Sequence, residues 1–78
     1  METYLHKDNT RGFFVDIGDK SSIEAALNRN GIVIVSVEEA FRVNEILVFE
    51  FRVKAEESEI AFALDSMVKL IRPYPRGK

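Results

Sequence analysis

The sequence contains no cysteine and no tryptophan, and it has only two prolines and one histidine among its 78 residues. Without cysteine, neither a disulfide nor a thiolate metal site can reinforce a domain whose small core is marginally stable by itself. The lack of cysteine is compatible with a reducing compartment, so we expect a cytoplasmic protein.

Long apolar segments are also missing. No run approaches the roughly 18 apolar residues that indicate a membrane-spanning helix. The start, METYLHKDNTR, lacks the apolar core of a signal peptide. Eleven basic and 13 acidic residues give a net charge of −2, which argues against general affinity for nucleic acid but leaves a local basic patch possible. Because the sequence shows neither a membrane-spanning run nor the apolar core of a signal peptide, we expect no contact with a membrane.

The length predicts one domain spanning residues 1–78, with loose termini at 1–10 and 73–78. Apolar periodicity predicts five elements in the order β-α-β-β-α. They are a strand over 12–18, a helix from a Ser21–Glu24 capping box to Arg29, strands over 32–43 and 46–54 joined at Asn44–Glu45, and a helix over 56–71. The predicted fold is an α+β two-layer sandwich, in which a three-stranded antiparallel sheet carries both helices on one face.

Residues with catalytic potential are few and scattered. His6 lies in a predicted loose terminus, and no serine has a partner base in view. Glu38 and Glu39 are neighbours on a strand, so they point to opposite faces and cannot act as a pair. The glycines form no phosphate-binding loop, and no spacing suits a metal. We expect a protein that is not an enzyme and needs no cofactor.

The second predicted helix carries apolar residues on more than one side. Ile60, Leu64, Met67 and Ile71 form one stripe, which is typical of a helix that covers a sheet. Phe62 projects away from that stripe. With flanking residues it predicts a second packing surface for a protein partner, formed by Phe62, Ala63, Ser66 and Leu70.

The stretch FRVNEILVFEFRVKAEESEIAFALDSMVKLI, residues 41–71, resembles the small Pcc-type subunit of the KEOPS complex. Ala55-Glu56-Glu57 and Asp65-Ser66 stand where that family has an Ala-x-acidic segment and a small polar pair. GFFVDIGDKSSIEAAL, residues 12–27, is similar to the family's first strand and helix. The chain departs from the family where Phe62 replaces a basic residue and where the spacing from Glu57 to Asp65 is one residue shorter.

The resemblance implies a function that composition does not. The KEOPS complex of archaea and eukaryotes makes threonylcarbamoyladenosine on transfer RNA. Its small subunit is non-catalytic, dimerises through its sheet, packs its helices on the catalytic subunit and helps to hold transfer RNA. A free-standing RNA-binding or ligand-binding regulatory module remains the alternative.

Two further interaction sites are predicted from the residues. A three-stranded sheet exposes two edge strands. One of them, either 32–43 or 12–18, is long and apolar, and such an edge recruits another strand. Because the first stretch starts without charge or proline, we expect a homodimer or heterodimer there, through Ile32, Ile34, Val35 and Val37. The tail after the second helix, which contains two prolines, predicts contacts with RNA through Arg72, Tyr74, Arg76 and Lys78. The alternative is a tail that only keeps the protein in solution.

Overall fold

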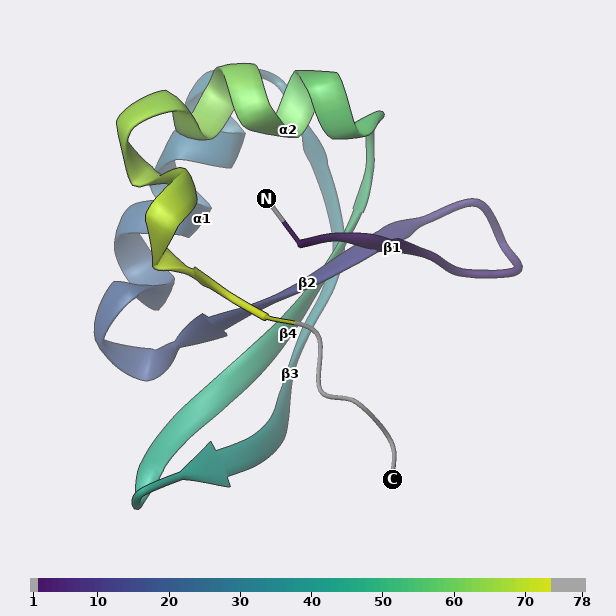
Figure 1. The fold of residues 1–78 in the computed structure, drawn as a ribbon. Helices are drawn as coiled ribbons and strands as arrows, with labels where there is room; N and C mark the ends of the chain where they lie inside the picture. Colours follow the sequence, from purple (N-terminus) through teal and green to yellow (C-terminus); the bar gives the residue numbers. More distant parts are fainter. Residues whose placement is uncertain (1, 74–78) are drawn as a thin grey trace.

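The structure is a computed structural model that describes residues 2–73, without the side chains of Ser66 and Val68. Two helices lie against a sheet whose long β3–β4 hairpin extends beyond them (Figure 1). Its elements follow in the order β1 (Tyr4–Leu5), β2 (Arg11–Asp16), the 3₁₀ turn η1 (Ile17–Asp19), α1 (Lys20–Arg29), β3 (Val33–Val43), β4 (Ile46–Lys54), α2 (Glu57–Leu64), the 3₁₀ segment η2 (Asp65–Leu70) and β5 (Ile71–Arg72).

Within residues 2–73 the sheet has five strands, so the prediction of three was wrong. Its order is β1-β2-β4-β3, and β5 also pairs with β2. Every strand pair within residues 2–73 is antiparallel. The small α+β domain, with its antiparallel sheet and two helices, is confirmed. The extra strands β1 and β5 have two residues each, which is too short to leave a period-2 pattern in the sequence.

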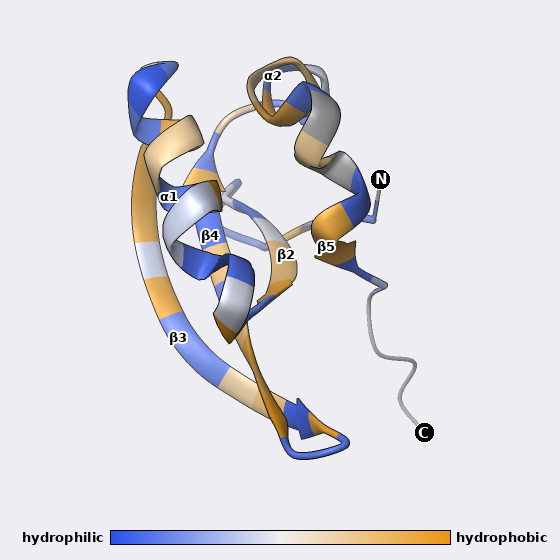
Figure 2. Cartoon of the chain, turned by 90° about the vertical axis from the view of Figure 1, so that its left-hand side faces the viewer, coloured by the Kyte–Doolittle hydropathy of each residue, from blue (hydrophilic) through white to orange (hydrophobic). Residues whose placement is uncertain are grey.

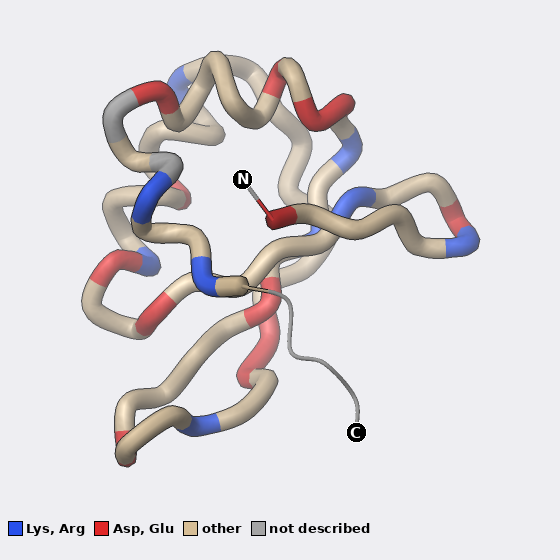
Figure 3. The backbone as a smooth tube through the Cα atoms, in the orientation of Figure 1, with Lys and Arg blue, Asp and Glu red and all other residues tan. Residues whose placement is uncertain are grey.

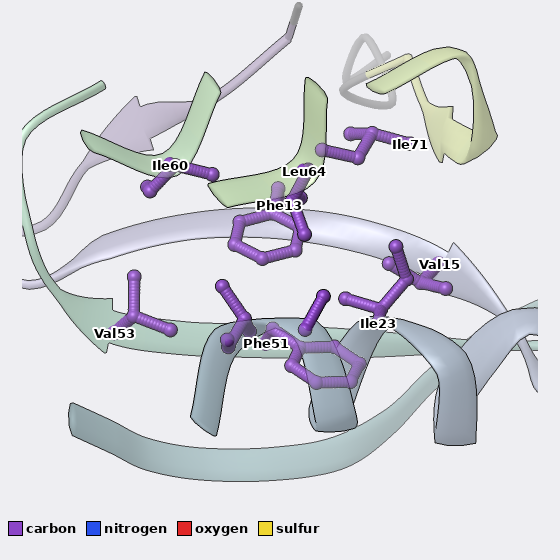
Figure 4. Packing of buried hydrophobic residues seen from close by; sticks show 10 residues of the cluster. Phe13, Val15, Ile23, Phe51, Val53, Ile60, Leu64 and Ile71 are labelled. Carbon is purple, nitrogen blue, oxygen red and sulfur yellow. The ribbon is translucent and has the colours of Figure 1, made fainter. Parts of the chain in front are cut away.

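The core lies between the sheet and the helices. Phe13 of β2 stacks on Phe51 of β4 with ring centroids 5.5 Å apart, and residues from both helices close over them (Figure 4). Helix α1 contributes the buried residues Ile23, Ala26 and Leu27. Of the stripe predicted for the second helix, Ile60, Leu64 and Ile71 are buried. The core cluster comprises Phe13, Val15, Ile23, Ala26, Leu27, Phe51, Val53, Ile60, Leu64 and Ile71.

The second helix is shorter than the predicted span of 56–71. It ends at Leu64, because Asp65 has φ 17° and ψ −95°, which is not a helical conformation. Asp side chains compete with the helix for backbone hydrogen bonds and so disfavour helix interiors. The 3₁₀ segment η2 and strand β5 continue the chain, and they still bring Met67 and Ile71 to the core.

Residues 2–10 are folded back on the sheet, whereas the sequence predicted a loose terminus over 1–10. The amide of His6 donates to the carbonyl of Thr10 at 2.8 Å, and the amide of Asn9 donates to the carbonyl of His6 at 2.9 Å. These bonds close a hairpin that pairs Tyr4 with Gly12. We call residues 2–10 the N-terminal arm.

Both helix starts differ from the prediction. Helix α1 begins at Lys20 without a side-chain cap, because the chain turns through η1 before Ser21 is reached. The strand prediction of 12–18 fails at its end for the same reason, and Ile17 is exposed in η1. A capping box is present instead at α2, where the amide of Glu56 donates to the Glu59 carboxylate at 2.8 Å.

The β3–β4 hairpin turns at the predicted Asn44–Glu45. Both residues have positive φ, 50° and 70°, which is the signature of a two-residue type I′ turn. Strand β4 matches the predicted range of 46–54, and β3 starts one residue after the predicted 32. The hairpin is therefore the part of the fold that the sequence predicts best.

Candidate interaction surfaces

Strand β3 is an edge of the sheet. Within residues 2–73 it pairs with β4 alone, so the outer backbone groups of its 11 residues have no strand partner. Figure 2 shows β3 as the outermost strand on its side. The other candidate edge, residues 12–18, is closed: β4 lies on one side of β2, and β1 and β5 lie on the other.

The four predicted edge residues do not share one environment. Ile32, Ile34 and Val37 are half-buried and pack against the core. Val35 differs, because it sits at a register shift of the β3–β4 ladder and is 47% exposed. Val33, which the prediction omitted, is also exposed. The apolar character of this edge therefore comes from Val33 and Val35, while the other three mainly support the fold.

Phe62 is the most exposed large apolar side chain of the described residues, at 79%. It borders an open depression of about 390 Å³ between the end of α1, the start of β3 and α2. Of its predicted companions, Ala63 and Leu70 are half-buried, and the side chain of Ser66 is not described. The depression is lined by Asn30, Gly31, Ile32, Lys54, Ser58, Glu59 and Phe62.

Because α2 ends at Leu64, Phe62 and Leu70 do not lie along one helix as the prediction assumed. The depression beside Phe62 is lined partly by residues outside α2, among them Ile32 and Lys54. Sequence reasoning missed them because a depression built from the α1–β3 turn, the end of β4 and α2 leaves no periodic signal in any one of these segments. The partner surface formed by Phe62, Ala63, Ser66 and Leu70 stays a prediction.

The sheet face that points away from the helices, which we call the open face, carries a polar cluster that the sequence did not reveal. At its centre the Tyr4 hydroxyl donates to Oε2 of Glu50. His6 Nε2 lies 3.2 Å from the same oxygen. Beneath them, the Phe14 ring contacts those of Tyr4 and Phe41, with centroids 5.6 and 5.1 Å apart. His6, which the sequence placed in a loose terminus, is therefore held on the sheet.

A second set of contacts holds the turn of the N-terminal arm. The Thr10 hydroxyl donates to Oδ1 of Asp8 at 2.7 Å, and the Thr10 amide donates to the same oxygen at 3.1 Å. Arg52 reaches Oδ2 of Asp8 at 3.0 Å. These hydrogen bonds, chiefly those from Thr10, lower the pKa of Asp8 from 3.8 to about 2, and Arg52 adds a favourable charge.

The predicted RNA-binding tail is described only at its start. Arg72 belongs to β5, and its NH1 lies 3.1 Å from Oδ2 of Asp16 on the neighbouring strand β2. This guanidinium is therefore already engaged within the fold. Tyr74, Arg76 and Lys78 lie outside the described residues, and their RNA contacts stay a prediction.

Among residues 2–73, no three His, Asp or Glu side chains are grouped so that they could hold a metal ion. No described helix is long and apolar enough to cross a membrane. Acidic residues lie close together along the backbone in the middle of the β3–β4 hairpin (Figure 3), where Glu38 lies directly opposite Glu50. The surfaces that remain are a strand edge and an aromatic side chain beside a depression.

The likeness to known proteins was tested in three ways, against protein-family models, against curated proteins and against solved structures. None of the three comparisons found a match to this chain.

Proposed function

We propose that this chain is a non-catalytic subunit that pairs with a second copy, or with a similar chain, through β3. The observation that carries the proposal is the asymmetry of the sheet. One edge is closed by β1 and β5, while the 11-residue edge of β3 has no partner strand within residues 2–73. Unpaired strand edges of this length recruit other strands unless something blocks them.

The proposal extends to a larger assembly through Phe62. An aromatic side chain that is 79% exposed contributes little to the folding of its own domain. At interfaces, in contrast, aromatic side chains that fill a partner's pocket are among the residues that contribute most to affinity. The resemblance to the small KEOPS subunit would make that partner the catalytic subunit of the complex that modifies transfer RNA, with transfer RNA held by the whole assembly.

Two measurements test the proposal. Sedimentation of the purified chain at micromolar concentration should give a dimer, and a monomer alone would contradict pairing through β3. Purification from the native host should recover a large ATP-binding protein with the chain. Recovery of the chain without such a protein would contradict membership of the transfer-RNA-modifying complex, although the dimer itself would stand.

Phe62→Glu is the sharper variant for the second interface. The exposed position should tolerate glutamate in the free chain, because surface substitutions usually change stability by less than about 0.5 kcal/mol. Binding of the large partner should weaken by about 30-fold or more, as expected when an interface residue worth about 2 kcal/mol is lost. Ala61→Glu, one residue earlier on the same helix and also exposed, is the matched control. Unchanged partner binding by Phe62→Glu would make Phe62 an ordinary surface residue.

A free-standing ligand-binding module is the second candidate, and the depression beside Phe62 favours it. Its volume of about 390 Å³ falls within the range of small-molecule sites. This function requires a stable monomer in which the NMR signals of Phe62 and Lys54 shift when a small molecule binds. A dimer that shows no such shift with any of a set of metabolites would exclude it.

A further inference from the structure

The edge of β3 is not uniform along its length. The ladder to β4 shifts register at two places, between Ile34 and Ser36 and between Glu39 and Phe41. At such bulges one residue is left over and the pairing is locally disrupted. The longest regular stretch is therefore 36–39, which pairs residue by residue with 49–52 of β4.

Alternate residues of this stretch face opposite sides of the sheet. Directly opposed residues of an antiparallel pair share a face. Ser36 opposes Arg52 and Glu38 opposes Glu50, so both lie on the open face. Val37 opposes the buried Phe51 and lies on the helix side, where it packs against the core.

A second copy that continues the sheet must respect these faces. A two-fold axis perpendicular to the sheet keeps each residue on its own side, so open-face residues of one copy meet open-face residues of the other. At the axis, one residue of β3 must then lie directly opposite the same residue of the other copy, because neighbouring residues in the sequence point to different faces. Near the middle of the regular stretch only two positions satisfy this condition, Val37 and Glu38.

The two positions differ in their electrostatics. An axis at Glu38 places the two Glu38 carboxylates directly opposite each other, beside the Glu50 that each already faces. Like charges in directly opposed positions destabilise a strand pair. An axis at Val37 instead places Ser36 of each copy opposite Glu38 of the other, where a hydroxyl can donate to a carboxylate.

We infer that β3 of a second copy pairs antiparallel with β3 of the first. The two Val37 residues face each other across the two-fold axis, and Ser36 of each copy opposes Glu38 of the other. This register rests on the proposed pairing through β3 and specifies it. The two Val37 side chains meet on the helix side and extend the apolar contact from one core to the next. Self-complementarity at the centre of the edge favours a second copy over an unrelated strand.

Single cysteines test the register, because the chain has none of its own. Ser36→Cys and Glu38→Cys are prepared separately, one of them isotopically labelled, then mixed and oxidised gently. Directly opposed Cβ atoms lie about 4.5–5.5 Å apart and diagonal ones about 7–8 Å apart, whereas a disulfide needs about 3.5–4.5 Å. The mixed disulfide should exceed the share expected from random collision, and each variant alone should crosslink poorly.

The outcomes separate the register from the dimer. Efficient crosslinking of Glu38→Cys with itself would overturn the register and favour the axis at Glu38. A dimer by sedimentation that gives no mixed disulfide would also overturn it while leaving pairing through β3 in place. A monomer would overturn both. Isotope-filtered NMR on a mixture of labelled and unlabelled unsubstituted chains gives a check free of any folding defect, because Ser36 and Glu38 signals should show contacts between copies.

Discussion

The phenol ring of Tyr4 lies over Gly12, so close that a Cβ atom at that position would collide with the ring. A Cβ atom on Gly12 would come within 2.7 Å of Cζ of Tyr4. Tyr4 faces Gly12 across the β1–β2 pair, and from there its hydroxyl reaches Glu50 of β4. The glycine thus lets a side chain of the N-terminal arm cross β2 to a strand with which β1 does not pair.

Replacing Gly12 should therefore release the arm. In Gly12→Ala the added methyl group displaces the Tyr4 ring, since the ring is easier to move than the strand. We expect a loss of about 1 kcal/mol, the usual contribution of one hydrogen bond, measured by urea unfolding. Gly18→Ala is the control, because a Cβ there meets nothing within 4 Å. Equal stability of the two variants would contradict the role given to Gly12.

The β3–β4 turn should become more stable with glycine at position 45. Glu45 has φ 70°, and the left-handed region costs a residue with a side chain about 1–2 kcal/mol. Glu45→Gly should remove part of this cost and raise the midpoint of thermal unfolding. Asn44→Gly is the comparison, and its gain should be smaller because asparagine tolerates positive φ. A lower midpoint for Glu45→Gly would show that the turn is not strained.

Like charges face each other at Glu38 and Glu50, so neutralising Glu38 should stabilise the hairpin. Glu38→Gln is expected to raise the free energy of unfolding by about 0.2–1 kcal/mol at low salt, and less at high salt, because salt screens exposed charges. Glu39→Gln is the matched control, since Glu39 opposes Phe49 instead of a carboxylate. Gains of the same size in both variants would point to net charge and not to the pair.

Acid should loosen the arm at Asp8. Because folding lowers the pKa of Asp8 from 3.8 in the unfolded chain to about 2, this group stabilises the folded state fully above pH 3.8 and loses that effect as the pH falls towards 2. The Thr10 amide, which donates to Asp8, should report the titration by NMR with a midpoint near 2. In Asp8→Asn this step should vanish. A midpoint near 4 would mean that the hydrogen bonds from Thr10 do not persist in solution.

Local patterns predicted some elements well. Alternation over 46–54 and the turn at Asn44–Glu45 both appear in the structure, because each depends on neighbours in sequence. Helix α2 shows the limit of such reasoning. Its apolar stripe predicts correctly that Ile60, Leu64 and Ile71 reach the core. After Leu64, however, the chain brings Ile71 to the core through a 3₁₀ segment and a strand instead of a continued helix.

The candidate surfaces were harder to predict because they depend on contacts between distant residues. The contacts of Tyr4 and His6 with Glu50 span more than 40 residues of sequence. Gly12 was the one available sign, since glycine inside a strand often marks the close approach of another group. The edge of β3 was predicted from its lack of charge, but its bulge at Val35 depends on pairing with β4 and has no sequence signal.

The unequal edges of the sheet have a consequence for aggregation. Strands that add to both edges of a sheet produce open-ended fibres, whereas a contact that uses one edge and a two-fold axis is complete after two copies. Here β1 and β5 place two-residue strands along the outer side of β2. Once β3 is paired, the edge left to the sheet of residues 2–73 consists of those short strands, which offer an incoming chain little to extend.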